Sequence, residues 1–427
     1  MVLLDDAALK ADASAWFESL VRRGHTLSYY RLKDGLAMTL KTAGGEWECD
    51  NVVILSTQSV SPSERLLTAL LDFADAGGNV LLASGAASSR WTHDLLAEFG
   101  VTLGKEEVVD RFPPSAGGSV AAPWPAASDV GARRVVGAPP AGAAAAATVQ
   151  YRGVSVTANA AAVEMGSVAA LRAPPTAFLP SAAASAELPL AAGSELALAW
   201  AVQSRNNARL VVVGGAHVFL NEAKSTELAA RLSEWAFTER GVLRVCRVRH
   251  ALADGTPPER MLKRPLPENP LPMSTYPDPE WDPDAFVYRV KDDVVFTIEV
   301  DEVVPPSESG GLPVNETSPA SWRPFDAPDM QFEFVMLDPY ERRTMQSKGN
   351  GAMQVQFKVP DQYGVFRMRV KYTRPGLSTL LVNAQTSVRP FRHNEYDRFI
   401  VAATPYYTAV FAVLAGFFVL SAAIVYQ

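Results

Sequence analysis

Short apolar runs alternate with amphipathic stretches over the first hundred residues of the chain. The runs at 2–4, 51–56 and 80–82 are mostly apolar, which is typical of strands that are covered on both faces. The stretches between them carry apolar residues every three or four positions, which predicts helices: Leu9, Ala13, Trp16, Phe17 and Leu20, then Leu66, Leu67, Leu70, Leu71 and Ala74. This alternation predicts a parallel sheet with helices on both faces, a Rossmann- or flavodoxin-like α/β domain over residues 1–103.

The second of these helices has a clear predicted start. Ser61 is a candidate N-cap, Pro62 suits the first helical position, and Glu64 completes a capping box. Gly77-Gly78 predicts the end of the helix.

Residues 104–250 begin with an irregular part that is rich in Ala, Pro, Gly and Ser. Beyond it, residues 195–202 and 209–213 are typical of strands, and a helix is predicted from about Ser225. This second α/β segment either completes the first sheet or forms a domain of its own, and the sequence leaves both alternatives open.

Nine prolines between Pro257 and Pro283 predict an extended linker over residues 251–285. In residues 286–390 the period becomes two. Phe332, Phe334 and Met336 lie on one face of a predicted strand, and Phe366, Met368 and Val370 lie on one face of another. That alternation predicts an antiparallel β-domain, a sheet or β-sandwich.

After a juxtamembrane segment at 391–404, residues 405–427 contain no charged side chain. A helix over 405–426 rises about 33 Å, which matches the thickness of a bilayer core. Thr408, Ala412 and Gly416 recur every four residues, a small-residue stripe on which another membrane helix can pack closely. We therefore expect one C-terminal transmembrane helix, with the β-domain next to the bilayer.

Composition and topology signals narrow the class of protein. A formal charge of −7 gives no basic surface for nucleic acid. Cys49 and Cys246 allow at most one disulfide, and the sequence does not decide whether they pair.

Residues 1–4 enter a strand directly, so either a signal peptide has been removed from this numbering or the large region is cytosolic. Asn315 lies in an N-x-T sequon, a possible glycosylation site that favours a lumenal location.

A search for catalytic residues finds little. No G-x-G-x-x-G or P-loop motif is present, and His93 and His217 have no ligand-type neighbours. Ser84 follows a predicted strand and is the nearest approach to a nucleophile elbow. Asp5-Asp6 ends another strand, where helix capping explains an aspartate better than catalysis does. We therefore predict no catalytic, cofactor-binding or metal-binding residue.

Several longer segments, in order, resemble the 48-kDa subunit family of the eukaryotic oligosaccharyltransferase. The resemblance rests on residues 203–209 (QSRNNAR), 234–245 (EWAFTERGVLRV), 330–340 (MQFEFVMLDPY) and 355–366 (VQFKVPDQYGVF), with 387–390, 395–400 and shorter N-terminal matches. It extends over nearly the whole chain and is poorest in the Ala/Pro-rich middle.

The resemblance implies a non-catalytic subunit of the complex that moves a dolichol-linked oligosaccharide onto Asn in N-x-S/T of nascent proteins. It implies a single-pass type I protein of the endoplasmic reticulum membrane, with a cleaved signal and a large lumenal region. It further implies a catalytic multispanning subunit, ribophorins and a small defender-against-death subunit as partners, with donor glycan or nascent chain as further contacts. The family's usual signal and short basic cytosolic tail are not in this sequence.

Two other hypotheses follow from the residues. One is a membrane-anchored α/β enzyme of amidotransferase-like or hydrolase type that uses Ser84 or Asp5. The other is a carbohydrate-binding receptor that acts without other subunits.

Overall fold

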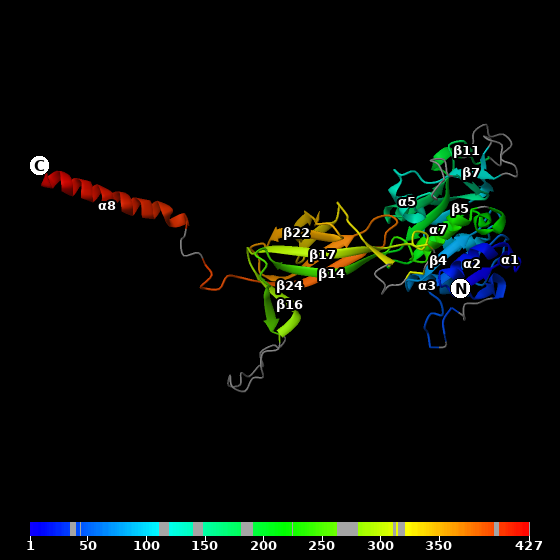
Figure 1. Cartoon of the computed structure of the whole chain (residues 1–427), viewed down its shortest axis with the longest axis horizontal. Coiled ribbons are helices and arrows are strands. Elements are labelled where there is room, and N and C mark those ends of the chain that lie inside the picture. The colour runs from blue at the N-terminus through cyan, green and yellow to red at the C-terminus, as the bar shows by residue number, and fades with distance from the viewer. Residues whose placement is uncertain are drawn as a thin grey trace.

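The computed structural model describes residues 1–34, 40–42, 44–110, 119–139, 148–180, 191–223, 225–262, 281–310, 313–314, 321–396 and 401–426. An N-terminal α/β unit lies at one end of the molecule and a β unit lies in the middle. The C-terminal helix α8 lies at the other end (Figure 1).

One mixed sheet forms the centre of the α/β unit, in the strand order β2-β1-β3-β4-β13-β12-β9-β5, with β10 also paired to β12. Its first five strands are parallel, as the apolar runs predict: β2 (Tyr29–Arg31), β1 (Val2–Leu4), β3 (Asn51–Leu55), β4 (Asn79–Ala83) and β13 (Arg209–Val213). The rest are antiparallel: β12 (Ala197–Gln203), β9 (Val154–Ala158), β5 (Val101–Glu107) and β10 (Val168–Arg172).

Helices cover both faces of this sheet. Trp16 of α2 (Ser14–Arg22) and Trp235 of α7 (Thr226–Ala236) belong to the core on one face, where α1 (Leu9–Asp12) and α5 (Val130–Val136) also lie. Phe73 of α3 (Glu64–Asp75) and Leu95 of α4 (Arg90–Glu98) belong to the core on the other face. The sheet is buried between them, which explains why its central strands are apolar at almost every position.

The predicted start of α3 is wrong by two residues. The helix begins at Glu64, and Ser63 is its N-cap residue, with extended backbone and no side-chain capping bond. Ser61 and Pro62 lie outside the helix. Sequence signals place helix ends poorly because the first turn forms only where its apolar residues reach the core, here from Leu66.

The irregular part of the α/β unit contains short elements at its side. These are β6 (Val109–Asp110), β7 (Val120–Pro123), β8 (Thr148–Tyr151), α6 (Ala160–Glu164) and β11 (Ala177–Phe178). Single turns of 3₁₀ helix also occur in this unit: η1 (Leu32–Asp34), η3 (Gly193–Glu195), η4 (Ala216–Phe219) and η5 (Asn221–Ala223). Another, η8 (Val401–Ala403), directly precedes α8.

The β unit consists of two sheets. One has the order β14-β17-β22-β21, with β18 beside β17: β14 (Leu243–Leu252), β17 (Asp293–Val303), β22 (Ala352–Lys358), β21 (Gln346–Ser347) and β18 (Trp322–Pro324). The other is β15 (Glu259–Leu262), β16 (Trp281–Arg289), β24 (Leu380–Arg389), β23 (Gly364–Tyr372), β19 (Gln331–Val335) and β20 (Pro339–Thr344), in that order. Both are antiparallel except for the parallel pair β16–β24.

The two sheets of the β unit share one hydrophobic core. Phe296 of the first sheet contacts Phe332 of the second, with ring centroids 5.0 Å apart. Within the second sheet, the rings of Phe334 and Phe366 stack at 4.5 Å. The alternating residues that the sequence places on one face, Phe366, Met368 and Val370, are buried here.

The sheets do not follow the predicted domain boundaries at 103 and 250. Strand β13 pairs with β4, so residues 1–103 and the second α/β segment share one sheet, which was one of the two open alternatives. Strand β14 crosses residue 250 and belongs to the β unit, and β15 and part of β16 lie in the predicted linker. Cross-strand hydrogen bonds to β17 and β16 extend the sheets there, and most of the prolines fall in 263–280, outside the described residues.

Helix α8 (Thr404–Val425) has 22 residues, with Pro405 in its first turn. In the described part of the chain, the segment Val401–Val425 is the one candidate membrane span, and none of it is buried against the rest of the molecule. The element agrees closely with the predicted span.

Candidate functional site

Asp5 lies at the carboxyl end of β1 and accepts hydrogen bonds from two backbone N–H groups, those of Thr57 at 2.5 Å and Gln58 at 2.6 Å. Asp5 does not cap a helix, whereas Asp6 Oδ1 accepts from the Ala8 N–H at 3.0 Å in the turn that leads into α1, so only the second residue of the pair Asp5-Asp6 bonds the start of the helix. The loop after the adjacent parallel strand β3 lies directly beside Asp5. The N–H groups of this loop therefore bind the carboxylate. The carboxylate therefore fixes a loop.

Ser84 follows β4 at the same edge of the sheet, and its side chain is fully buried. Its Oγ has no hydrogen-bond partner among the described residues. A serine nucleophile needs a base within hydrogen-bonding distance. His93 instead bonds Ser88 Oγ at 3.0 Å, and His217 lies in η4. The described residues also contain no group of three or more His, Cys, Asp or Glu side chains that would hold a metal.

An extended polar network lies where the α/β unit meets the β unit. It brings together residues 203–209, 233–243, 305–309 and 374–379, which come from four separate parts of the chain. We call this region the joint.

Arg209, at the start of β13, is the centre of the joint and is only 1% exposed. Its guanidinium donates to the carbonyl oxygens of Trp235 at 2.8 Å, Arg240 at 2.6 Å and Gly241 at 2.8 Å, and to Gln203 Oε1 at 3.2 Å. The Trp235 carbonyl lies in the last turn of α7 and the other two follow the helix, so the guanidinium lies at a helix C-terminus, where a cation is favourable. Burial lowers the pKa of Arg209 to about 9, so the side chain stays protonated at neutral pH.

Glu234, in α7, connects the helix to a loop of the β unit. Its buried carboxylate accepts from Arg240 at 3.0 Å, from the Ser307 backbone N–H at 2.8 Å and from the Ser307 hydroxyl at 2.9 Å. Arg240 also donates to Glu308 at 3.3 Å. Because the carboxylate is fully hydrogen-bonded, its burial is compatible with a stable fold.

Glu239 connects the same segment to the N-terminal helix α2. It accepts hydrogen bonds from Arg23, which is also buried, and from His25 Nε2 at 2.9 Å. Arg23 donates in addition to Ser233 at 2.7 Å. The segment after α7 is therefore held to the end of α2 through Glu239 and to β13 through Arg209.

Direct bonds then cross from this segment to the start of β24. Trp235 Nε1 donates to the Gly376 carbonyl at 2.9 Å, Leu243 N–H donates to Ser378 Oγ at 2.8 Å, and Ser378 N–H donates to the Gly241 carbonyl at 2.8 Å. Gly241 has φ +66°, and a Cβ there would collide with the carbonyl oxygen of Gly376. Glycine is thus required both by the backbone angle and by the close approach of the two units.

A groove of about 1040 Å³ lies beside the joint. Val163 and Met165 of the α/β unit and Leu381 of the β unit line it with exposed apolar side chains. Arg205 and Lys371 add positive charge.

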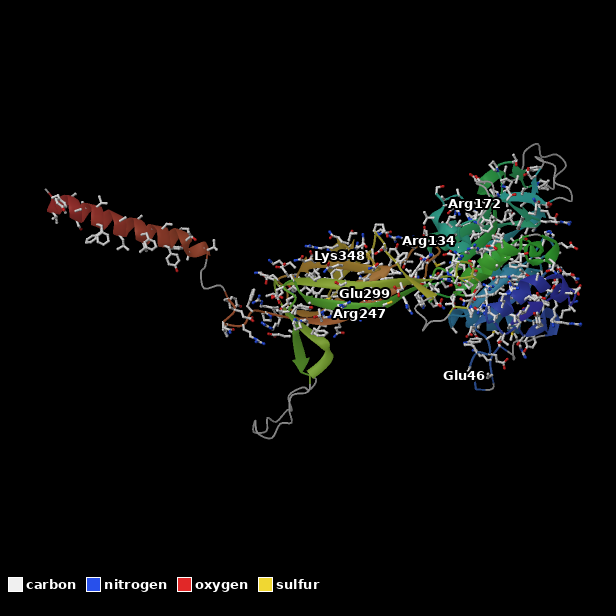
Figure 2. All side chains as sticks on the ribbon, in the orientation of Figure 1. Glu46, Arg134, Arg172, Arg247, Glu299 and Lys348 are labelled. Carbon is white, nitrogen blue, oxygen red and sulfur yellow. The ribbon has the colours of Figure 1, made fainter. Side chains whose placement is uncertain are left out.

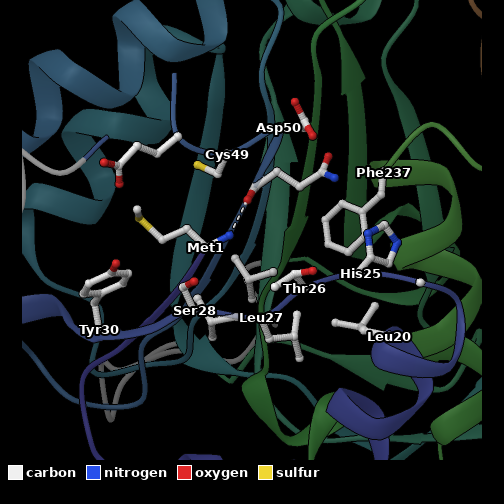
Figure 3. A pocket seen from close by; sticks show the side chains of 15 residues that line it. Met1, Leu20, His25, Thr26, Leu27, Ser28, Tyr30, Cys49, Asp50 and Phe237 are labelled. Carbon is white, nitrogen blue, oxygen red and sulfur yellow. Dashed lines mark hydrogen bonds between the residues drawn. The ribbon is translucent and has the colours of Figure 1, made fainter. Parts of the chain in front are cut away.

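A smaller pocket of about 350 Å³ lies at the amino ends of the parallel strands (Figure 3). Its walls include His25, Tyr30, Cys49 and Phe237. Cys49 and Cys246 are both free thiols and lie in different units, which answers the question of pairing that the sequence leaves open. Burial raises the pKa of the Cys49 thiol, so it is not an activated nucleophile.

The remaining residues that the sequence singles out lie away from the joint. Thr408, Ala412 and Gly416 are exposed on α8, and only Thr408 makes a side-chain bond, to the Pro405 carbonyl at 2.8 Å. Helix packing on this stripe stays a prediction. Asn315 lies outside the described residues.

Comparison with known proteins gives the family. The family description "OST48, N-terminal domain" matches residues 1–239, and "OST48 middle domain" matches residues 277–427. The chain belongs to the OST48 family. The match to the N-terminal domain ends inside the joint, so the joint is where the two OST48 regions meet.

Three OST48 relatives carry the name dolichyl-diphosphooligosaccharide–protein glycosyltransferase 48 kDa subunit. The Drosophila melanogaster protein is 31% identical over 445 residues, covering 99% of this chain and 89% of its own. The Arabidopsis thaliana protein is 30% identical, covering 100% and 92%, and the Danio rerio protein is 29% identical, covering 99% and 90%. A solved α-L-fucosidase isoenzyme 2 from Paenibacillus thiaminolyticus overlaps 84% of this chain and 46% of its own at 11% identity with a TM-score of 0.31, which has no bearing on the OST48 assignment.

The joint contains two of the segments that carry the resemblance to the OST48 family, 203–209 and 234–245. Sequence reasoning recognised these segments but did not predict their contacts. The available signal was Arg209 itself, an arginine directly before a run of buried apolar residues, since such a cation needs several acceptors nearby.

Proposed function

We propose that this chain is a non-catalytic subunit of an oligosaccharyltransferase complex. In this role it supports the transfer of a dolichol-linked oligosaccharide to Asn in N-x-S/T of nascent proteins. The observation that carries the proposal is membership of the OST48 family over both of its regions, with named relatives aligned along nearly the whole chain.

The geometry supports a framework role. Four distant parts of the chain meet in the joint through buried charged side chains with several hydrogen bonds each, centred on Arg209 and Glu234, which favours a fixed angle between the two units. At the carboxyl edge of the sheet, where α/β enzymes usually bind substrate, Asp5 fixes a loop, and Ser84 Oγ has no hydrogen-bond partner in the described part of the chain. The chain thus contributes shape and contact surface, and the transfer reaction belongs to another subunit.

The same proposal includes topology and partners. Helix α8 anchors a single-pass type I protein in the endoplasmic reticulum membrane, with the large N-terminal region in the lumen. The partners are a catalytic multispanning subunit, ribophorins and a defender-against-death subunit. The stripe of Thr408, Ala412 and Gly416 contacts a neighbouring membrane helix, and Asn315 is accessible to glycosylation.

Positioning of the donor glycan or of the nascent chain is a further part of the proposed role. The groove beside the joint supports it, because its volume of about 1040 Å³ and its charged lining residues, Arg205 and Lys371 together with Glu164, suit an extended polar ligand.

The test is affinity purification of the full chain from detergent-solubilised membranes, with glycosylation measured in cells depleted of the chain. We expect the catalytic subunit to co-purify, and we expect depletion to lower the occupancy of N-x-S/T sites until the chain is restored. Purification without a catalytic partner, or turnover of a sugar or amide substrate by the isolated chain, would contradict the proposal. Glycan binding without any companion subunit would favour the receptor hypothesis.

A further inference from the structure

Several large apolar side chains are strongly exposed at one end of the β unit. The exposed fractions are 91% for Leu337, 69% for Tyr363, 51% for Val365 and 47% for Tyr340. These residues lie in or directly beside strands whose other faces supply the core, so folding of the β unit does not require their exposure. Clustered exposed apolar residues of this kind mark contact surfaces.

The four residues lie close together at one end of the second sheet. Strand β19 pairs with β23 through Val335 and Arg367, which places the turn at 336–338 next to the first residues of β23. The sulfur of Met336 lies 3.0 Å from the position that a Cβ on Gly364 would take. The ring of Tyr340 contacts that of Phe366, with centroids 5.5 Å apart. We call Leu337, Tyr340, Tyr363 and Val365 the apolar tip.

The apolar tip lies at the end of the β unit from which the chain leaves for the membrane. Val365 pairs with Ser387, two residues before β24 ends at Arg389. Residues 390–403 then lead to α8, and a segment of that length spans at most about 50 Å even when fully extended. In Figure 1, α8 lies beyond this end of the β unit, and the α/β unit lies at the opposite end.

Charges around the apolar tip are largely paired. Lys291 bonds Asp361 at 2.9 Å, and Arg389 bonds Glu395 at 2.7 Å. The exposed carboxylate of Asp338, beside Leu337, limits how deep the tip can lie, because a carboxylate must remain hydrated. Tyrosines next to a leucine, with charges at the rim, match the polar–apolar boundary of a bilayer.

We propose that the apolar tip rests in the headgroup region of the membrane that α8 spans. The β unit then has two attachments to the bilayer, the helix and the tip, which together fix its tilt. This inference needs only the membrane anchor and does not depend on the role of the chain in glycosylation. A protein partner on the same surface is the competing occupant, and the experiment distinguishes the two.

The test uses the full chain in phosphatidylcholine vesicles, with Cys49 and Cys246 replaced by serine and a single cysteine introduced as Leu337→Cys. An environment-sensitive fluorophore on that cysteine reports contact with lipids that carry a quencher near the headgroup. The matched control is Leu381→Cys, which is also exposed but lies at the far end of the β23–β24 pair. We expect blue-shifted, strongly quenched fluorescence at position 337 and little change at position 381.

Equal and weak quenching at both positions would overturn the proposal. Protection of position 337 from a water-soluble thiol reagent in native membranes, without quenching in vesicles, would assign the surface to a partner protein and also overturn it. If the cysteine variants do not fold, hydroxyl-radical footprinting of the unaltered chain provides the same comparison. Oxidation of Tyr363 should then fall on transfer from detergent to vesicles, and unchanged oxidation would contradict lipid contact.

Discussion

Arg209 and Trp235 are linked twice: the guanidinium lies over the indole ring, 4.6 Å from its centroid, and donates to the Trp235 carbonyl at 2.8 Å. Trp235 in turn donates from its indole N–H to Gly376 of the β unit. A strand, a helix end and the entry to β24 therefore meet through one pair of side chains. Arg134, which Figure 2 labels at the side of the α/β unit next to the β unit, adds a bond to the Pro375 carbonyl at 3.3 Å.

Removal of this cation should weaken the whole joint. We expect Arg209→Met to lower the free energy of unfolding by about 3–5 kcal/mol, because the carbonyls of Trp235, Arg240 and Gly241 lose their donor. Urea unfolding of the full chain in detergent measures the effect. Arg205→Met, an exposed arginine of the same segment, should change stability by no more than about 0.5 kcal/mol. Equal effects of the two substitutions would show that Arg209 does not stabilise the joint.

Gly241 tests the close approach of the two units. Gly241→Ala should destabilise the chain by more than about 2 kcal/mol, since the positive φ is unfavourable and the methyl group collides with the Gly376 carbonyl. We expect faster limited proteolysis of the chain between the units. Gly255→Ala is the matched control, because Gly255 has φ +83° but open space around it, and should cost only about 1 kcal/mol. A Gly241 variant no more sensitive than the control would contradict a tightly packed joint.

Substitution of two buried serines distinguishes a structural role of the chain from a catalytic one. Ser84→Ala should be neutral or stabilising by up to about 1 kcal/mol, because its hydroxyl is buried without a partner, and site occupancy of N-x-S/T in cells should not change. Ser378→Ala should instead destabilise by about 1–3 kcal/mol, since the Leu243 N–H loses its acceptor. Thermal unfolding and glycoprotein occupancy are the two measurements. A loss of glycosylation with Ser84→Ala, at unchanged protein level, would revive the enzyme hypothesis.

The burial of His250 predicts that the stability of the β unit depends on pH. Burial lowers the pKa of its imidazole below 6.5, and its Nδ1 lies 2.6 Å from the Tyr288 hydroxyl, next to the Phe286 ring. The unfolded chain therefore binds the proton more tightly, so stability is complete above pH 6.5 and decreases as the pH falls below it. Urea unfolding at pH 7.5 and 5.5 should show this decrease, and His250→Gln should reduce it. His393→Gln, at an exposed position, should leave it unchanged; an equal effect of both variants would contradict the assignment.

Individual elements could be predicted wherever the spacing of apolar residues along the chain indicates which side chains are buried. Strand β13 and helix α7 coincide with their predicted ranges, and alternation along β23 correctly places Phe366 in the core. The boundaries were less predictable. The start of α3 was wrong, and of the pair Asp5-Asp6 only Asp6 bonds the turn before α1, while Asp5 bonds the loop after β3. A capping signal is local, whereas the partner of a polar group depends on which loop folds next to it.

The sequence by itself determined the alternation of the first strands and helices, the length and apolar character of α8, and the family. Apolar periodicity, span length and matching segments are all properties of neighbouring residues along the chain. Only the tertiary structure decided that β4 pairs with β13, 130 positions away, and that Arg209 meets Gly241 beside the entry to β24. Periodicity states that a residue is buried but not against what, and a buried guanidinium has its acceptors only once distant segments have packed together.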